Sequence, residues 1–276
     1  MLKISVILLI KNGYDYILYL NDLFNEIELK YKNIYDFEYY FYENNSIDNT
    51  VDAFEIFFKG RKGEFFSENL SINKNFSDLI AKERAQYMAF LRNKLKSKHN
   101  SLDSNFTLLL DADIVFNKET LERLLLNFNK IENLIGVTPF DLYYPKYEKY
   151  KIFHYYDSLA FITKDNITHI ETINCCMFSE CRSCCIITKK KNLNLLNRNN
   201  ITEVNSAFGG FFVIKTSVYN IINWDEYTED ECEHHSFCKK IRDFGSIFID
   251  PRLVVATTTT NKYISVQKNI EKLNHK

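Results

Sequence analysis

The stretch FTLLLDAD, residues 106–113, decides the fold class, because an apolar run passes directly into two aspartates. A continuous apolar run of this length predicts a strand that is buried on both faces of a parallel sheet. Asp111 and Asp113 then stand at the carboxyl end of that strand. Because open α/β sheets bind ligands beyond the carboxyl ends of their strands, the two carboxylates lie where a binding site is expected.

Strand and helix patterns alternate on both sides of this stretch. Two further strands are predicted at residues 4–10 and 37–42, and a loop with a short strand at 60–76. Helical spacing of apolar residues is found at 14–29, 51–58, 81–98 and 119–128, where Ser77-Asp78 and Asn117 are expected to cap the last two helices. The alternation predicts an α/β fold, with a mostly parallel sheet and helices on both faces.

The pattern becomes less regular from residue 139 onward. Pro139, Pro145 and a Tyr-rich stretch at residues 143–156 predict long connections or edge strands. The remaining expectations are a Gly turn feeding a strand at 208–214, a short helix at 217–222, a helix at 231–244 that stops at Gly245, a short strand at 246–250, and a polar tail or frayed helix at 267–276. We expect a single domain over residues 1–262, with halves 1–130 and 131–262, and a polar C-terminal tail over 263–276.

The charge balance excludes some classes of function. The 276 residues include 35 Lys plus Arg and 36 Asp plus Glu, so the formal net charge is −1, which excludes a general electrostatic grip on nucleic acid or anionic membrane. Apolar residues make up 46% of the chain, enough for a sizeable core. No apolar run reaches the length of a membrane span, and the start lacks the features of a secretory signal. We therefore expect a cytoplasmic protein with reduced thiols.

The aspartate pair favours a metal ion. Only Ala112 separates Asp111 from Asp113, so both side chains can leave the sheet edge toward the same cleft. Two carboxylates aimed together repel unless a cation sits between them. Oxygen ligands suit Mg²⁺ or Mn²⁺, particularly when a diphosphate fills the remaining positions. The alternative is that Asp111 ends the strand and Asp113 caps a turn.

A second group of titratable residues lies at 229–235, which reads EDECEHH before an apolar helix. A carboxylate there could deprotonate a hydroxyl group, and the neutral imidazole of His234 could complete a metal sphere with Asp113. The alternative is an acidic helix start that is stabilised by the helix dipole. The preceding Gly209 and Gly210 would let the backbone approach a ligand closely, or form a plain turn.

The cysteines are clustered, and five of the seven lie between residues 175 and 185. Cys181 and Cys184 form a Cys-x-x-Cys pair, and with Cys176 and either His169 or another cysteine they could hold a structural zinc. No second spaced pair follows, so buried free thiols are the expected state.

A family resemblance rests on these segments. A strand ending in Lys11-Asn12-Gly13-Tyr14, a second ending in residues 43–50 (ENNSIDNT) and a third ending in the aspartate pair resemble glycosyltransferases of the GT-A fold. More narrowly, residues 43–50 and 87–93 are similar to segments of the fungal capsule-associated mannosyltransferase family and of glycosyltransferases of large DNA viruses. The resemblance covers residues 3–255 and implies a GT-A, Rossmann-like sheet. The fungal family often has a different acidic pattern where this chain has its Asp-x-Asp (DXD) motif.

The resemblance also implies that the protein is a metal-dependent glycosyltransferase, which would use Mn²⁺ or Mg²⁺. It would move a sugar from a UDP- or GDP-sugar bound by the first half to a hydroxyl of a glycan or protein bound by the second. Metal ligands would be Asp111, Asp113 and His234, and catalytic residues Glu233, His234 and Glu231. Donor-binding residues would be Lys11, Asn12, Glu43, Asn44, Arg84, Arg92, Asn93, Asp111, Gly209 and Gly210. An arginine suits this role because its guanidinium matches phosphate oxygens bidentately.

Other functions stay open at this point. A phosphotransferase or phosphatase of the haloacid dehalogenase type also uses an Asp-x-Asp pair after a strand, but two strand-helix units precede Asp111 here. A nucleotidyltransferase usually opens with a Gly-rich loop carrying an arginine, which residues 11–13 do not match. A non-catalytic GT-A-like module that binds a partner or glycan is the third alternative. A homodimer is also left open.

Overall fold

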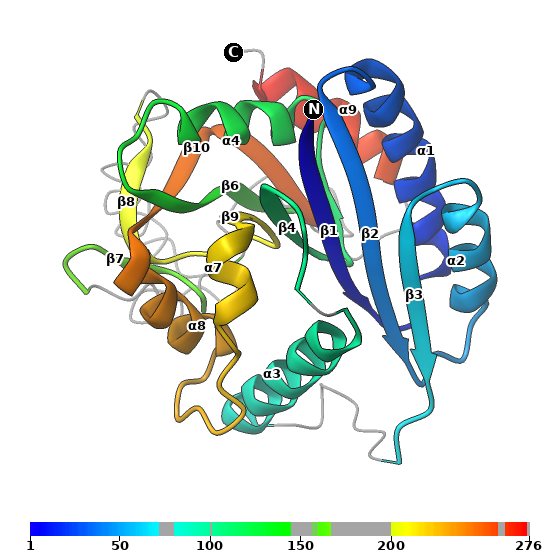
Figure 1. Cartoon of the computed structure of the whole chain (residues 1–276), viewed down its shortest axis with the longest axis horizontal. Helices are drawn as coiled ribbons and strands as arrows, with labels where there is room; N and C mark the ends of the chain where they lie inside the picture. The colour runs from blue at the N-terminus through cyan, green and yellow to red at the C-terminus, as the bar shows by residue number, and fades with distance from the viewer. Residues whose placement is uncertain are drawn as a thin grey trace, which may run out of the picture.

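The computed structural model describes residues 1–71, 80–99, 101–144, 157, 159–166, 200–258 and 263–274. Within these residues a ten-stranded sheet forms the centre of the molecule, with strand order β3-β2-β1-β4-β9-β6-β10-β8-β7 and β5 paired to β10 (Figure 1). The expected cysteine cluster, its partner His169 and the Ser77-Asp78 cap lie outside the described residues.

The first half follows the predicted alternation. The elements are β1 (Leu2–Ile10), α1 (Tyr14–Tyr31), β2 (Tyr35–Asn44), α2 (Thr50–Phe58), β3 (Gly63–Glu68), α3 (Ala81–Lys98) and β4 (Phe106–Asp111). β1 pairs in parallel with both β2 and β4, and β2 pairs in parallel with β3. The carboxyl ends of these strands therefore share one edge of the sheet.

The second half adds antiparallel and mixed pairing. Its elements are β5 (Ile114–Val115), α4 (Thr120–Phe128), β6 (Leu134–Tyr144), β7 (Ile162–Thr163), β8 (Thr202–Ser206), β9 (Phe211–Lys215), α7 (Thr216–Ile221), α8 (Glu233–Ile241), η2 (Arg242–Phe244), β10 (Ser246–Thr258) and α9 (Tyr263–Asn274). β9 runs antiparallel to β4 and β6, whereas β10 runs parallel to β6. The predicted cap at Asn117 is wrong, because α4 starts at Thr120 without a side-chain cap.

The sequence predicted a long connection or an edge strand at Pro139, and this prediction is wrong. Pro139 lies inside β6, which pairs with β9 on one side and β10 on the other. Proline lacks the N–H of a regular ladder, and strands tolerate it at a bulge. The register of β10 against β6 shifts between Asp250, opposite Pro139, and Val254, opposite Phe140. The bulge therefore absorbs the proline in a central strand.

The carboxyl-terminal segment is not a polar tail. α9 buries Val266 and Ile270 in the core. The side chain of Asn274 accepts a hydrogen bond from the Val254 N–H at 2.8 Å and donates one to the Val254 carbonyl at 3.1 Å. α9 is thus packed against β10 as part of the folded unit.

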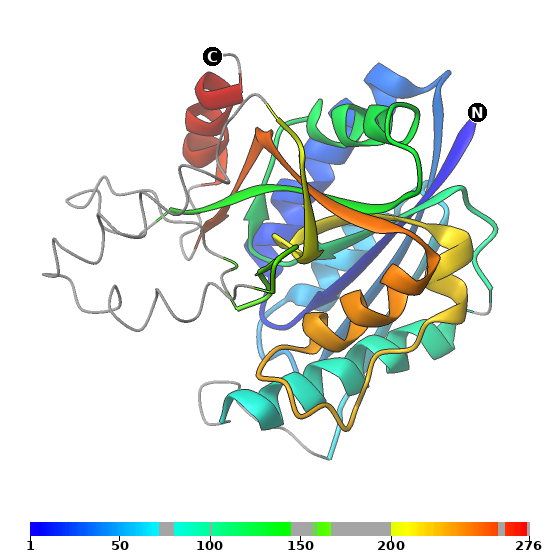
Figure 2. The same ribbon diagram turned by 90° about the vertical axis from the view of Figure 1, so that its left-hand side faces the viewer.

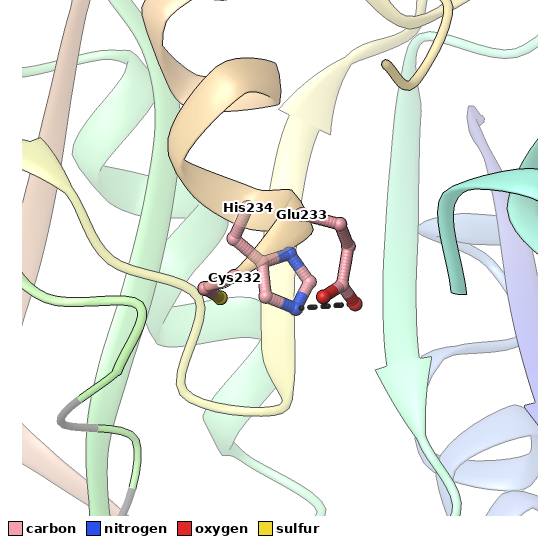
Figure 3. A group of neighbouring side chains, drawn as sticks. All are labelled: Cys232, Glu233 and His234. Atoms are coloured by element: carbon pink, nitrogen blue, oxygen red, sulfur yellow. Dashed lines mark ion pairs between the residues drawn. The ribbon is translucent and has the colours of Figure 1, made fainter. Parts of the chain in front are cut away.

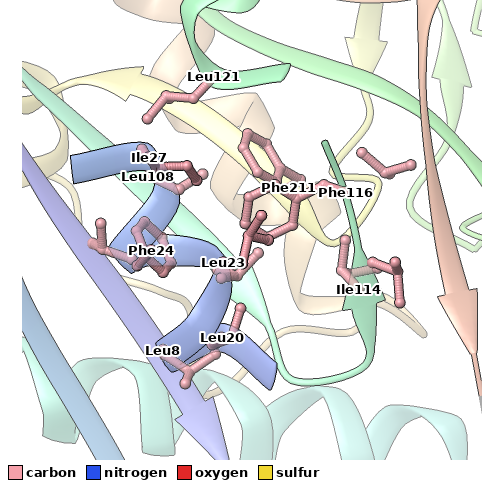
Figure 4. Close-up of a cluster of buried hydrophobic side chains, with 14 of the residues drawn as sticks. Leu8, Leu20, Leu23, Phe24, Ile27, Leu108, Ile114, Phe116, Leu121 and Phe211 are labelled. Atoms are coloured by element: carbon pink, nitrogen blue, oxygen red, sulfur yellow. The ribbon is translucent and has the colours of Figure 1, made fainter. Parts of the chain in front are cut away.

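Two hydrophobic clusters lie on opposite faces of the sheet. Side chains of β1 alternate between them, with Val6 and Leu8 in one cluster and Ile7 in the other, as the period of a strand requires. The first cluster packs under α1, α2, α4 and α9, and the second under α3, α7 and α8 (Figures 1 and 2; part of the first cluster in Figure 4). Among the described residues, no helix has the length and apolar character that crossing a membrane requires.

Candidate active site

The aspartate pair lies at the sheet edge where the sequence predicted it. Asp111 ends β4 and donates its N–H to the Gly210 carbonyl at 2.8 Å, while the Asp113 carbonyl accepts the Thr258 N–H at 3.0 Å. The hydroxyl of Tyr16 on α1 donates to the Asp111 carbonyl at 3.1 Å. Burial, reinforced by the charge of Asp111, raises the pKa of Asp113 to about 7. The two carboxylates therefore repel each other and favour a proton or a cation.

The Gly209-Gly210 turn lies directly against this pair. Both glycines have left-handed backbones, with φ of +59° and +60°. A Cβ on Gly210 would lie 2.3 Å from an Ile114 side-chain carbon and 3.5 Å from the Asp111 Cβ, and one on Gly209 would lie 2.5 Å from the Thr138 hydroxyl. The close backbone approach that the sequence allowed is thus made to the acidic strand end itself.

Arg92 joins the aspartate pair to the start of α8. From α3, its Nη2 lies 3.1 Å from Asp111 Oδ1 and its Nε lies 3.4 Å from Glu233 Oε1. The guanidinium also lies over the rings of Phe208 and Trp224, 5.1 and 4.9 Å from their centres. With only 7% of its surface exposed, Arg92 is a buried cation held between two carboxylates.

Glu233 and His234 are both buried at the first turn of α8 (Figure 3). His234 stacks on the Phe208 ring at 3.7 Å, and its Nε2 lies 3.4 Å from Glu233 Oε1. Burial, together with the positive charge of Arg92, lowers the pKa of His234 well below its usual value. His234 is therefore a neutral imidazole at physiological pH, able to bind a metal or accept a proton.

Two further aspartates that sequence reasoning left without a role belong to this region. Asp157 Oδ2 accepts the Gly209 N–H at 2.6 Å, and burial, with the charges of Asp111 and Glu233, raises the pKa of Asp157 to about 7. Asp141 is fully buried, and its two oxygens accept hydrogen bonds from the N–H and hydroxyl of Thr257. No local motif marks either residue, because only the tertiary fold brings them to Asp111.

The loops after β1 and β2 bind each other. Asn12 donates its N–H to the Ser46 hydroxyl at 3.0 Å, and its side-chain oxygen accepts the Ile47 N–H at 2.8 Å. Glu43 is buried, accepts the Ser46 N–H at 3.0 Å and accepts a hydrogen bond from the Ser67 hydroxyl. These side chains, expected to contact a nucleoside, are occupied in bracing the two loops.

Of the other expected donor-binding residues, Arg84, Lys11 and Asn44 lie near the site, whereas Asn93 is engaged elsewhere. Arg84 is exposed on α3, and its positive charge acts to lower the pKa of Asp113, so it lies close enough to influence that carboxylate. Lys11 and Asn44 lie at the edge formed by the carboxyl ends of β1 and β2. Asn93 points elsewhere: its amide bonds to the backbone N–H and carbonyl of Trp224, both at 2.9 Å, and fixes α3 to that loop.

Glu231, expected beside the reacting groups, is exposed, and its charge acts on His235. By contrast, the charge of Asp111 acts on Asp113, and the charges of Asp111 and Glu233 act on Asp157. Arg92 is a buried cation between Asp111 and Glu233. This excess of negative charge at a sheet edge fits a divalent cation.

Comparison with known proteins identifies the fold. No family model matches the sequence, and no curated protein matches it either. Among solved structures, the mannosyltransferase PcManGT from Pyrobaculum calidifontis, in complex with GDP-Man and Mn²⁺, has a TM-score of 0.50 at 10% identity over 94% of this chain and 57% of that one. S. aureus TarS 1–349 in complex with UDP-GlcNAc has a TM-score of 0.51 at 14% identity over 99% and 65%.

A third structure agrees with these two. Glucosyl-3-phosphoglycerate synthase from Mycobacterium tuberculosis, with UDP, Mn²⁺ and glucosyl-3-phosphoglycerate, has a TM-score of 0.51 at 10% identity over 99% of this chain and 78% of that one. This chain spans less than two thirds of the length of PcManGT and of TarS 1–349. The narrower resemblance to fungal capsule and viral enzymes stays a prediction. The likeness in fold, with a large central sheet flanked by helices, shows that the chain has the GT-A fold.

Proposed function

We propose that this protein is a metal-dependent glycosyltransferase that moves a sugar from a UDP- or GDP-sugar to a hydroxyl of a glycan or protein. One observation carries the proposal. In a GT-A fold, the Asp-x-Asp pair at the end of β4 is joined through the buried Arg92 to Glu233 and His234 at the start of α8. Acidic ligands and acid–base groups thus share one edge of the sheet.

Asp111, Asp113 and His234 would hold the cation, Mn²⁺ or Mg²⁺. The fit rests on Asp113, whose pKa is raised to about 7 by burial and by the charge of Asp111, and on the neutral imidazole of His234, which is influenced by Asp111. When bound, such a cation supplies positive charge to the leaving diphosphate. The Mn²⁺ bound in two of the similar structures supports this choice.

Arg84 is the arginine that would contact the donor phosphates. The guanidinium of Arg92 is already engaged by Asp111 and Glu233, so its role is to fix the positions of these carboxylates. Arg84 is exposed and electrostatically linked to Asp113, which supports a direct contact with phosphate oxygens. Lys11, Asn44 and the braced Asn12–Glu43 loops would form the nucleoside side of the site.

The acceptor side of the reaction needs a general base within reach of the attacking hydroxyl. Glu233 is the residue we assign to this role, because His234 and Arg92 hold its carboxylate at the acidic edge. Gly209 and Gly210 would line the sugar, and the exposed Glu231 would lie at the rim. Asp157, whose pKa is raised to about 7 by burial, is the competing base.

The test is nucleotide release from a panel of UDP-, GDP- and CMP-sugars with Mn²⁺. We expect one sugar nucleotide to be turned over, with Asp113→Asn abolishing turnover. Glu233→Gln should lower kcat by about 100-fold, whereas Asp157→Asn should lower it less than 10-fold. The reverse order would move the base to Asp157, and release from no sugar nucleotide would contradict the proposal.

The same preparation distinguishes the alternatives. Hydrolysis of p-nitrophenyl phosphate without sugar nucleotide would support the phosphatase. A glycan that stabilises the protein equally with and without Mn²⁺, without turnover, would support the binding module.

A further inference from the structure

A second group of metal-ligating atoms adjoins the carboxylate edge. The ligand atoms of Cys232, Glu233 and His234 all lie within 4.8 Å of one another, and the three side chains are 5–7% exposed. In Figure 3 the Cys232 sulfur and the Glu233 carboxylate lie on either side of the His234 ring. Three consecutive residues of a regular helix point in different directions, because each turns about 100° from the last.

The start of α8 explains the convergence. Cys232 precedes the helix and has an extended backbone, with φ of −139° and ψ of 125°. Glu233 and His234 already follow the helical path. The change of backbone conformation between Cys232 and Glu233 therefore turns the thiol back toward the two side chains that follow it.

Two of the ligand groups have bonding capacity to spare within the described part of the chain. Cys232 is a free thiol. His234 is 95% buried, and its Nδ1 has no hydrogen-bond partner among the described residues, although a buried ring nitrogen ordinarily finds one. Its Nε2 lies 3.4 Å from Glu233 Oε1. Tetrahedral Zn²⁺, with bonds of about 2.0–2.3 Å, holds its ligands roughly 3–4 Å apart, so small side-chain rotations suffice.

The donor set identifies the class of metal. A thiolate, an imidazole and one carboxylate suit Zn²⁺ and Co²⁺, whereas Mg²⁺ and Mn²⁺ prefer oxygen ligands. The charges nearby are mixed: Asp157 acts on Cys232 and Asp111 acts on His234, while Arg92 and Arg84 oppose a cation. Glu233 is itself part of the set, so three acidic groups stand against two arginines.

We infer that Cys232, Glu233 and His234 form a three-ligand site for a thiophilic divalent cation, with Zn²⁺ as its physiological occupant. Binding breaks the S–H bond of Cys232, forms a sulfur–metal bond and releases the proton to solvent, with no change of oxidation state. The site leaves a fourth position of the metal open.

One consequence rests on the proposed function. His234 would also bind Mn²⁺, and Glu233 would be the general base. When Zn²⁺ occupies this site, His234 and Glu233 are no longer available for catalysis. Zn²⁺ therefore inhibits glycosyl transfer in competition with Mn²⁺.

The direct test reads the sulfur–metal bond with Co²⁺ as the probe. Since other thiols also bind Co²⁺, the experiment uses the full chain carrying Cys175→Ser, Cys176→Ser, Cys181→Ser, Cys184→Ser and Cys185→Ser. We expect an intense thiolate-to-Co²⁺ charge-transfer band, which Zn²⁺ removes by displacing Co²⁺. Cys232→Ser should abolish the band and weaken Zn²⁺ binding at least 10–100-fold, roughly the loss that even outer-shell changes cause.

Cys238→Ser is the matched control. Cys238 is buried on the same helix, but its sulfur faces the Ala207 carbonyl at 4.0 Å, so its removal should leave the band intact. A band that survives Cys232→Ser, or no band in the parent protein, would overturn the inference.

A second measurement needs no change at the site. X-ray absorption of the same protein loaded with Zn²⁺ should show one sulfur and otherwise nitrogen and oxygen ligands, and a shell without sulfur contradicts the site even if Cys232→Ser does not fold. These readouts are independent of turnover. A sulfur-bound metal in a protein that releases no nucleotide would count against the proposed function alone, and turnover without a sulfur-bound metal would count against this site alone.

Discussion

At the carboxyl ends of β1 and β2 the polar side chains bond to one another, whereas at the end of β4 carboxylates crowd together. Asn12, Glu43 and Ser46 share hydrogen bonds that tie two loops into a platform. Asp113 and Asp157 instead have their pKa values raised to about 7 by burial and by neighbouring acids. The comparison teaches that the first region is complete in itself, while the second is arranged to gain a positive charge.

Replacing each of two buried arginines in turn tests this comparison with the largest expected effect. Arg92→Met should lower the free energy of unfolding by about 3 kcal/mol, the low end for a broken buried pair, because it leaves Asp111 and Glu233 uncompensated and Asp111 is 33% exposed. The substitution should also change how much Mn²⁺ stabilises the protein against unfolding. The measurement is urea unfolding with and without Mn²⁺.

Arg61→Met is the matched variant outside the acidic edge. The Arg61 side chain is as little exposed as that of Arg92, at 7%, and bonds to Glu28 and Asn25 on α1 instead of to the carboxylates of that edge. We expect it to destabilise the protein while leaving the stabilisation by Mn²⁺ as in the wild type. An altered Mn²⁺ response in Arg61→Met but not in Arg92→Met would contradict the assignment of the cation to the acidic edge.

Two glycines, Gly210 and Gly60, separate the cost of backbone strain from the cost of a steric clash with a neighbouring side chain. Gly210→Ala should cost about 2–3 kcal/mol of stability, because alanine is strained at a φ of +60° and its Cβ would meet Ile114 at 2.3 Å. Gly60 has a φ of +83° with nothing within 4 Å of the added carbon, so Gly60→Ala should cost only about 1 kcal/mol. Chemical unfolding of both variants measures the difference, and equal losses would remove the argument for packing at the turn.

The raised carboxyl pKa values predict a pH dependence. Between an unfolded pKa of about 3.9 and a folded pKa of about 7, native Asp157 binds more protons than the unfolded chain does, so its contribution to stability falls as pH rises. The stability of metal-free wild type minus that of Asp157→Asn should therefore decrease from pH 4 to about pH 7 and then level off. His234, whose lowered pKa has the opposite effect, is common to both proteins and cancels. A difference that rises with pH in this window contradicts the assignment.

The smallest effect is expected in the platform. Ser46→Ala removes the hydroxyl that accepts the Asn12 N–H and should cost about 1 kcal/mol. The Mn²⁺-induced shift in Tm should not change, because no carboxylate of the acidic edge is touched. Differential scanning calorimetry with and without Mn²⁺ tests both statements. Loss of the Mn²⁺-induced shift in Tm would show that the platform takes part in metal binding.

Much of the first half of the chain could be read from the sequence. The apolar run at residues 4–10 and the helical spacing at 81–98 reflect local periodicity, and the structure has β1 at Leu2–Ile10 and α3 at Ala81–Lys98. Asp111 and Asp113 were found because they directly follow a buried strand.

The rest of the fold and of the site depended on tertiary contacts that local patterns do not contain. Pro139 argued against a central strand, since the bulge that accommodates it is formed with β10, distant in sequence. Asp157 lies 46 positions after Asp111 in the sequence, and only its hydrogen bond to the Gly209 N–H and the influence of the Asp111 charge link it to the acidic edge. Asn93 was expected at the donor because it follows Arg92, yet neighbouring helical residues face different directions, and Asn93 bonds to Trp224 instead.

The central claim is that the acidic edge binds a sugar nucleotide together with a divalent cation. The most direct measurement is the Tm of the wild type and of Asp113→Asn with UDP- and GDP-sugars, each with and without Mn²⁺. We predict a rise of several degrees for one sugar nucleotide plus Mn²⁺ in the wild type, as mass action gives for a ligand well above its Kd, and none in Asp113→Asn. The same rise in Asp113→Asn, or no Mn²⁺-dependent rise with any sugar nucleotide, would contradict the account.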